Sequence, residues 1–273
     1  MFSFGMCLVA VGILLSIGII SMQDSSFSTI YALGFGRATA EMIISSWSVK
    51  VAGDGALLTN VLIANLPQLL FSGIYLTLNN VLTRVQLAVE WSAYSIQRKS
   101  LRVSHDRDGS QRATYFLQLP YRIGLPLMLI SATLHWLISQ SIFLVSIDTY
   151  NADGMPKKNA KGYAGQDEEH VATCGYSPLA IICVLIVSGV LVLFVLSMSV
   201  RTLPSGGMPL VGSNSVGIAA ACHPPEEGGD ERQPLMWGAV GTAVLHDRPD
   251  EVLGHCSFSS SPVEMPVVGH LYA

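Results

Sequence analysis

Charge is scarce in this chain. Only 12% of its 273 residues are Asp, Glu, Lys or Arg, whereas 50% are hydrophobic and the mean hydropathy is +0.47. A soluble domain of this length would carry about twice that share of charged residues. The shortage of charge therefore argues against an ordinary soluble globular protein.

Motifs that carry known chemistry are also lacking. The sequence contains no nucleophile elbow, zincin helix, P-loop or kinase motif set. Its five cysteines are scattered and suggest no disulfide framework. Cys222-His223 and His255-Cys256 are two soft-ligand dipeptides, but adjacent residues rarely both reach one metal ion. We therefore expect no catalytic residues, no metal site and no cofactor, and we expect that the protein is not an enzyme.

Four long apolar runs separate the segments that hold the charge. They cover residues 1–22, 57–82, 123–147 and 179–200. An α-helix needs about 20 apolar residues to cross a hydrocarbon core, and each run is long enough. The first run lacks the basic leader of a signal peptide, so we expect a retained helix. The sequence predicts an all-α membrane protein with four transmembrane helices.

The basic residues predict the orientation of these helices. Residues 83–122 carry seven of them: Arg84, Arg98, Lys99, Arg102, Arg107, Arg112 and Arg122. Residues 23–56 carry two, and the three lysines of residues 148–178 are offset by five acidic residues. Basic loops favour the cytosolic side. We therefore expect a cytosolic loop at 83–122, two extracytoplasmic loops, and both termini in the cytosol.

Polar groups interrupt the second and third runs. Pro67 and Pro126 are expected to kink or interrupt their helices. His135 lies near the middle of the third run, with Gln140 following it. An ionisable group at that depth predicts either a proton or substrate contact, or a histidine that packs against a neighbouring helix. Asn65 and Gln68 of the second run are its expected partners.

The basic loop and the tail leave several interpretations open. The helical spacing of apolar residues continues from Val81 to Leu101. Arg98, Lys99 and Arg102 are then expected either to meet anionic lipid or only to fix the topology. They form no nucleic-acid motif, so we expect no nucleic-acid partner.

The tail, residues 201–273, is rich in proline and glycine. This composition favours disorder. Two strings, Pro234–Gly238 and Gly254–Phe258, are apolar enough to dock on a surface. A free tail and a small loop-rich module are therefore both compatible with the sequence.

Several strings resemble a known group of proteins. They are Ala64–Gln68, Glu90–Ser92, Leu101–Ser104, Gln111-Arg112, Tyr115–Arg122, Leu134–Ser141, Ala221–Pro225, Pro234–Gly238 and Gly254–Ser260. Together they resemble the C-terminal half of uncharacterised multi-pass membrane proteins of filamentous fungi that carry an N-terminal domain of unknown function. The resemblance implies that this N-terminal region is missing here and that the tail strings belong to an ordered module. It implies no catalytic residues.

These observations predict a multi-pass integral membrane protein that acts as a non-enzymatic scaffold or interaction protein. The alternative is a transporter or channel component that uses the polar groups of the second and third helices, with His135 at its centre. The expected partners are the lipid bilayer and other membrane helices or the missing N-terminal region.

Overall fold

The computed structural model divides the chain into two compact units. The helical unit comprises residues Met1–Leu78 and Leu125–Ser199, and the loop–tail unit comprises Asn79–Gly124 and Val200–Ala273. The residues that the structure describes are 26–37, 42–43, 54–115, 118–148, 170–200, 202–203, 206–224, 229–244, 252–267 and 269–272. Each unit is described by itself below.

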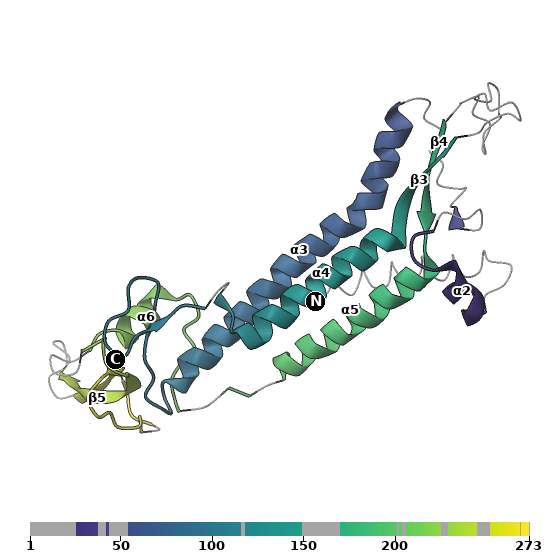
Figure 1. Ribbon diagram of the computed structural model, residues 1–273. Helices are drawn as coiled ribbons and strands as arrows, with labels where there is room; N and C mark the ends of the chain where they lie inside the picture. The colour runs from purple at the N-terminus through teal and green to yellow at the C-terminus, as the bar shows by residue number, and fades with distance from the viewer. Residues whose placement is uncertain are drawn as a thin grey trace, which may run out of the picture. The chain divides into compact units, whose positions relative to one another are not determined.

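Three long helices dominate the described residues. They are α3 (Asp54–Ala93), α4 (Tyr121–Ser141) and α5 (Pro178–Ser199), shown in Figure 1. All three are long and apolar enough to cross a membrane. The first apolar run, residues 1–22, lies outside the described residues. A short helix, α2 (Phe27–Leu33), contacts α5.

Neither proline ends its helix. Pro67 lies inside the 40-residue helix α3, and Pro126 lies in the second turn of α4. A proline removes one backbone donor and favours a bend. The ribbon of α3 bends in its first half, where Pro67 lies (Figure 1). The sequence predicted a kink or an interruption at each proline. The bend of α3 agrees with a kink, and neither helix is interrupted. At about 1.5 Å per residue, α3 is roughly 60 Å long, about twice the thickness of a hydrocarbon core.

The third apolar run does not stay helical to its end. Helix α4 ends at Ser141, and strand β3 (Ile142–Asp148) follows directly. It pairs antiparallel with β4 (His170–Tyr176), in the register Ile142↔Tyr176 to Asp148↔His170. Residues 142–147 are Ile-Phe-Leu-Val-Ser-Ile, rich in the β-branched and aromatic residues that favour strands. The expected helix of residues 123–147 is corrected to a helix followed by a strand.

The all-α fold class is corrected in the same way. The described residues form five helices and six strands, and three of these helices are long and apolar enough to span a membrane. The fourth predicted span, residues 1–22, lies outside the described residues. Sheet pairing occurs in both units.

The loop–tail unit is a small mixed module. It contains the end of α3, the two-residue parallel pair β1 (Arg102–Val103) and β2 (Arg112–Ala113), and helix α6 (Ser215–Ala221). Strands β5 (Met236–Val244) and β6 (Val252–Ser259) form an antiparallel ladder whose register shifts between Ala239 and Gly241. The Asn214 side chain caps α6 by accepting hydrogen bonds from two backbone amides. The tail is therefore a folded part of a module.

Candidate functional site

A hydrophobic core joins the basic loop to the tail. Its buried residues are Tyr94, Ala221, Leu235, Trp237, Cys256 and Phe258. The Phe258 ring meets the rings of Trp91 and Tyr94 edge-on, with centroids 5.2 and 5.3 Å apart. Edge-to-face pairs of this kind add stability beyond the area they bury. The end of α3 and strand β6 are thus joined by aromatic packing.

Backbone hydrogen bonds connect the same two segments. The Lys99 and Leu235 backbones bond to each other in both directions, at 2.8 and 2.9 Å. The Trp237 amide donates to the Tyr94 carbonyl at 3.0 Å, and the Ser110 amide donates to the Arg232 carbonyl at 2.8 Å. Residues more than 100 positions apart therefore complete each other's backbone bonding.

Arg98 binds the tail through its guanidinium group. The group donates to the carbonyls of Pro234 at 3.3 Å, Ser260 at 2.6 Å and Ser261 at 2.5 Å. A guanidinium suits this role because its donors form a rigid fork and it stays charged. Arg98 therefore holds the end of β6 beside the start of β5.

Arg102 has partners within the loop. Its Nε donates to the Glu90 carboxylate at 2.7 Å, and its guanidinium carbon lies 3.7 Å from the centre of the Tyr115 ring. It also bonds to the Tyr115 hydroxyl. Arg98 and Arg102, both predicted to contact lipid or fix the topology, thus have structural roles, and the backbone of Lys99 bridges to the tail.

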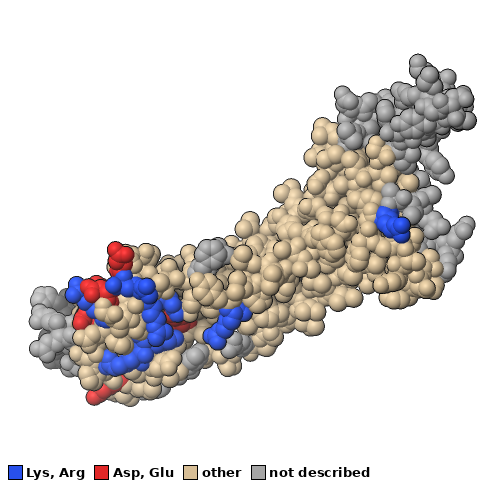
Figure 2. All heavy atoms as spheres, in the orientation of Figure 1, with Lys and Arg blue, Asp and Glu red and all other residues tan. Residues whose placement is uncertain are grey.

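Other basic side chains of the loop are exposed to solvent, as Arg98 is. Arg84, Arg107, Arg112 and Arg122 are exposed. On the visible face, Lys and Arg gather over the loop–tail unit, whereas the surface of the long helices is nearly free of charge (Figure 2). The basic character of residues 83–122 is therefore a surface property carried chiefly by these exposed arginines.

Burial alters the titration of groups in this core. Burial, with the nearby Glu90 carboxylate, raises the pKa of Tyr94 to about 12, against the smaller opposing effects of Arg102 and Arg112. The Tyr94 hydroxyl donates to the Ser100 carbonyl at 3.1 Å, which also needs the protonated form. Burial raises the pKa of the Cys256 thiol as well, so this thiol is a poor nucleophile.

The two Cys-His dipeptides lie close together through their histidines. The rings of His223 and His255 lie edge to face, 6.0 Å apart, and His255 Nε2 lies 2.8 Å from the His223 carbonyl oxygen. Across the part of the chain that the structure describes, no three His, Cys, Asp or Glu side chains are grouped to hold a metal ion. Tetrahedral zinc needs four ligands, or three and a water.

The four polar candidates of the helical unit do not converge. The His135 ring packs edge-on against Phe71, with centroids 4.8 Å apart. Asn65 Nδ2 donates to the Val61 carbonyl of its own helix at 2.8 Å, and Gln140 Nε2 donates to Ser139 Oγ at 3.3 Å. Asn65 is exposed and Gln68 is half-buried. The expected pairing of His135 with Asn65 and Gln68 is therefore corrected to packing on an aromatic ring of α3.

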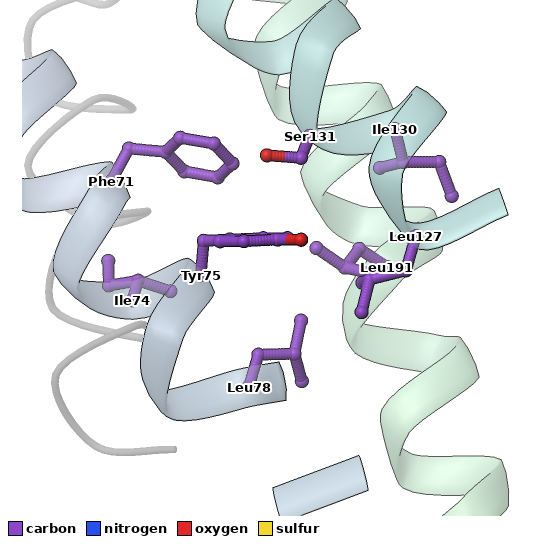
Figure 3. Close-up of a pocket in the computed structure, with 8 residues that line it drawn as sticks. All are labelled: Phe71, Ile74, Tyr75, Leu78, Leu127, Ile130, Ser131 and Leu191. Carbon is purple, nitrogen blue, oxygen red and sulfur yellow. The ribbon is translucent and has the colours of Figure 1, made fainter. Parts of the chain in front are cut away.

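A hollow beside these helices is small and apolar. Its lining residues come from α3, α4 and α5: Phe71, Ile74, Tyr75, Leu78, Leu127, Ile130, Ser131 and Leu191. The Tyr75 ring reaches across toward Leu127 and Leu191, and the Ser131 hydroxyl points toward Phe71 (Figure 3). The hollow holds about 10 Å³, whereas small-molecule sites usually measure about 300–1,000 Å³. It accommodates at most one water molecule.

One buried polar contact escaped the sequence analysis. Asn60 and Cys174 are fully buried, and the Cys174 thiol lies 3.6 Å from both the backbone and the side-chain oxygen of Asn60. Ala64 and Ile142 pack around them. The signal was the spacing of four between Asn60 and Ala64, which places both on one face of α3. The contact joins the start of α3 to β4.

Comparison with known proteins gives a family and no activity. No curated protein and no solved structure matches the chain. One family model, described as Domain of unknown function (DUF8419), matches residues 1–272. The match covers both the long apolar helices and the loop–tail unit. The chain therefore belongs to the DUF8419 family.

Proposed function

We propose that this protein is a multi-pass integral membrane protein whose loop–tail unit is a cytosolic interaction module. The observation that carries the proposal is the joint core of loop and tail, built from Tyr94, Trp237 and Phe258 and held by Arg98. A loop that served only to fix topology would not need a partner segment from the far end of the chain. A folded module attached directly to membrane helices suits a scaffold.

The positions of the arginines support a membrane placement. Tyr75, Ile130 and Leu191 line the same hollow and so lie at one level. Arg84 follows Tyr75 by nine residues, and Arg122 precedes Ile130 by eight, which is about 12–14 Å along each helix. Helix α5 ends at Ser199, eight residues beyond Leu191. Eight or nine residues thus separate the hollow from Arg84 on α3, from Arg122 on α4 and from the last residue of α5, and we take these positions as the boundary of the spans.

The orientation follows from the basic residues on that boundary. Arginines beside the end of a span favour the cytosolic side. The β3–β4 ladder belongs to the opposite ends of α4 and α5, and is then extracytoplasmic. Ten residues of α3, from Arg84 to Ala93, would continue into the cytosol and end in the aromatic core. Helix α3 would thus cross the membrane with its first part and extend into the cytosol with its last part.

The transporter alternative has less support in the geometry. His135 rests on Phe71, and the four polar candidates make their hydrogen bonds within their own helices or remain apart. The apolar hollow has room for at most one water molecule. The fungal source and the N-terminal domain implied by the resemblance stay predictions.

The experiment that tests the proposal is chemical crosslinking in intact membranes, followed by comparison of the captured partners. Cutting the chain after Arg201, or replacing Phe258 by Ala, should abolish the crosslinks of the full chain. His135→Ala should leave them unchanged, and so should the control Val216→Ala, at an exposed residue of α6. Unchanged crosslinks after truncation, together with a solute flux lost on His135→Ala, would favour transport instead.

A further inference from the structure

We infer that Ser110 is a phosphorylation site, and that its phosphate releases part of the tail from the basic loop. The enzyme would be a protein kinase that selects arginine three residues before its target serine. The inference rests on the proposed cytosolic placement of the loop–tail unit, because ATP and such kinases act there. It adds a point of regulation to the proposed interaction module.

The sequence sets Ser110 apart from the other hydroxyl residues. In all 273 residues, it is the one Ser or Thr that has Arg or Lys three positions earlier, in the string Arg107-Asp-Gly-Ser. Protein kinases choose substrates partly by such charge patterns. An arginine suits this recognition because its guanidinium stays charged and binds a carboxylate through two hydrogen bonds. Ser104 and Thr114, the exposed hydroxyl residues nearby, have an uncharged residue at that position.

Both ends of this string are open to solvent. Residues 104–110 are all exposed and belong to no helix or strand, so they can extend into the groove of an enzyme. Among the described residues, no ion pair or hydrogen bond holds the Arg107 side chain. By contrast, Ser92, Ser95 and Ser100 are buried. Access therefore favours the same serine that the sequence favours.

Ser110 lies where a turn of the loop meets a turn of the tail. Its amide and its hydroxyl both donate to the Arg232 carbonyl, each at 2.8 Å. The Asp108 carboxylate pairs with the Arg232 guanidinium at 3.1 Å. These contacts between residues 108–111 and 230–233 are here called the turn–turn contact. The Ser110 hydroxyl is thus one of the groups that join the loop to the tail.

The two turns meet backbone to backbone. Gly109 has a φ of +58°, which favours glycine, and a Cβ built there would lie 2.6 Å from the Arg232 carbonyl oxygen. The buried Gln111 adds a hydrogen bond from its Nε2 to the Glu231 carbonyl at 3.4 Å. Because the turns are this close, a change of chemistry at Ser110 acts directly on the turn–turn contact.

Phosphorylation replaces a hydrogen-bond donor by negative charge. The Ser110 oxygen attacks the γ-phosphorus of ATP and forms a P–O bond, while the bridging P–O bond to the β-phosphate breaks. ADP leaves, and the hydroxyl proton passes to a carboxylate of the kinase. The ester oxygen then has no proton to donate to the Arg232 carbonyl.

The charge of the phosphate acts in the same direction. A phosphoserine carries a charge of about −1.5 to −2 at neutral pH. The turn–turn contact already contains three carboxylates, those of Asp108, Asp230 and Glu231, and one guanidinium. A further anion is therefore repelled, and the contact opens. The tail turn at residues 230–233 is then free to meet a different partner.

Phosphorylation of the full chain in nanodiscs tests the site. The reagents are a purified Ser/Thr kinase that selects arginine at this position and ATP labelled in its γ-phosphate. The native chain should gain one phosphate, which Ser110→Ala abolishes and Arg107→Ala slows at least tenfold. Ser104→Ala and Arg112→Ala are the matched controls and should not change the rate. A phosphate on another residue, no phosphate, or an unchanged rate in Arg107→Ala would overturn the inference.

Amide exchange of the same samples tests the consequence. Ser110→Ala, which loses one hydroxyl hydrogen bond, should speed exchange of residues 108–111 by roughly 2- to 12-fold. Phosphorylated Ser110 should speed it more, and the Trp237 amide in the aromatic core should keep its protection. Exchange that stays unchanged or slows on phosphorylation would show that the phosphate holds the tail, and would overturn the proposed release.

Failure of this inference can be told apart from failure of the proposed function. Nanodiscs expose both faces of the protein, so phosphate incorporation does not depend on its orientation in the cell. Thiol labelling in intact cells reports that orientation separately. A cytosolic loop that gains no phosphate rejects the site alone, whereas an extracytoplasmic loop rejects the proposed placement and with it this regulation.

Discussion

The two units of this chain differ in where many of their polar side chains find hydrogen-bond partners. In the helical unit, side chains such as Asn65, Ser72, Thr77 and Thr133 bond to carbonyls four residues earlier in their own helix. In the loop–tail unit, Trp91 bonds to Pro209, and Arg98 reaches carbonyls more than 160 residues away. The first pattern suits lipid, where each helix must be self-sufficient, and the second suits water, where a core must hold segments together.

Substitution of one buried phenylalanine in each unit should have the largest effect on stability and tests this difference between the units. Phe71 and Phe258 are 7% and 8% exposed. Phe258→Ala should destabilise the loop–tail unit by about 3–5 kcal/mol, through lost transfer free energy and a cavity. Phe71→Ala should cost the helical unit less than half of that, because leaving its packed site exposes it to lipid rather than water.

Hydrogen exchange of the full chain in nanodiscs measures both losses, since each unit reports its own protection. Equal losses at the two positions would mean that both units fold against the same solvent.

Removal of the Arg98 side chain should have the next largest effect. Arg98→Ala deletes three charge-assisted hydrogen bonds to carbonyls, at a cost of about 1–2 kcal/mol for an exposed group. Arg98→Lys should recover less than half, because an ammonium cannot supply the same fork. Arg107→Ala, at another exposed arginine of the loop, is the control. Proteolysis between β5 and β6 should accelerate only when Arg98 is changed.

High pH should weaken the loop–tail unit and spare the helical unit. The pKa of Tyr94 is raised in the folded state, so the folded form retains its proton while the unfolded chain loses it. Stability is therefore complete below pH 10 and falls as pH rises from 10 to about 12. Tyrosinate absorbance and exchange of the β5 and β6 amides should change together, and Tyr94→Phe should remove most of this pH dependence.

The smallest expected effect concerns the start of α5. Ser177 Oγ donates to the Gly34 carbonyl at 3.0 Å, joining the segment after α2 to α5. Ser177→Ala should cost about 0.5–1.5 kcal/mol locally, measured as faster amide exchange over residues 26–37. Exchange in the loop–tail unit should not change. A global loss of protection would show that the two units unfold together.

The sequence predicted the long helices better than their surroundings. The apolar runs located α3, α4 and α5, because length and hydropathy are properties of a single segment. Residues 142–147 were assigned to a helix because an apolar run does not distinguish a helix from a strand. Their partner strand, residues 170–176, lies across a long connection that composition does not reveal.

The contacts of the candidate site could not be predicted from the sequence either, because they join segments that lie far apart along the chain. The strings around Trp237 and Phe258 were recognised as apolar, but their partners Tyr94 and Lys99 lie more than 100 residues away. The roles of Arg98 and Arg102 depend on which carbonyls and carboxylates come near them, and only the fold shows that. His135 was identified from its depth, whereas its packing on Phe71 depends on the rotation of two helices.

Labelling with a thiol reagent that cannot cross membranes tests the placement of the units most directly. Cysteines introduced at Tyr31 and at Arg107, both exposed, report the two sides in a background where Cys222 is replaced by Ser. In intact cells the reagent should label Tyr31→Cys and miss Arg107→Cys until the membrane is permeabilised. Labelling of Arg107→Cys but not of Tyr31→Cys in intact cells would contradict the account, because the loop–tail unit would then lie outside.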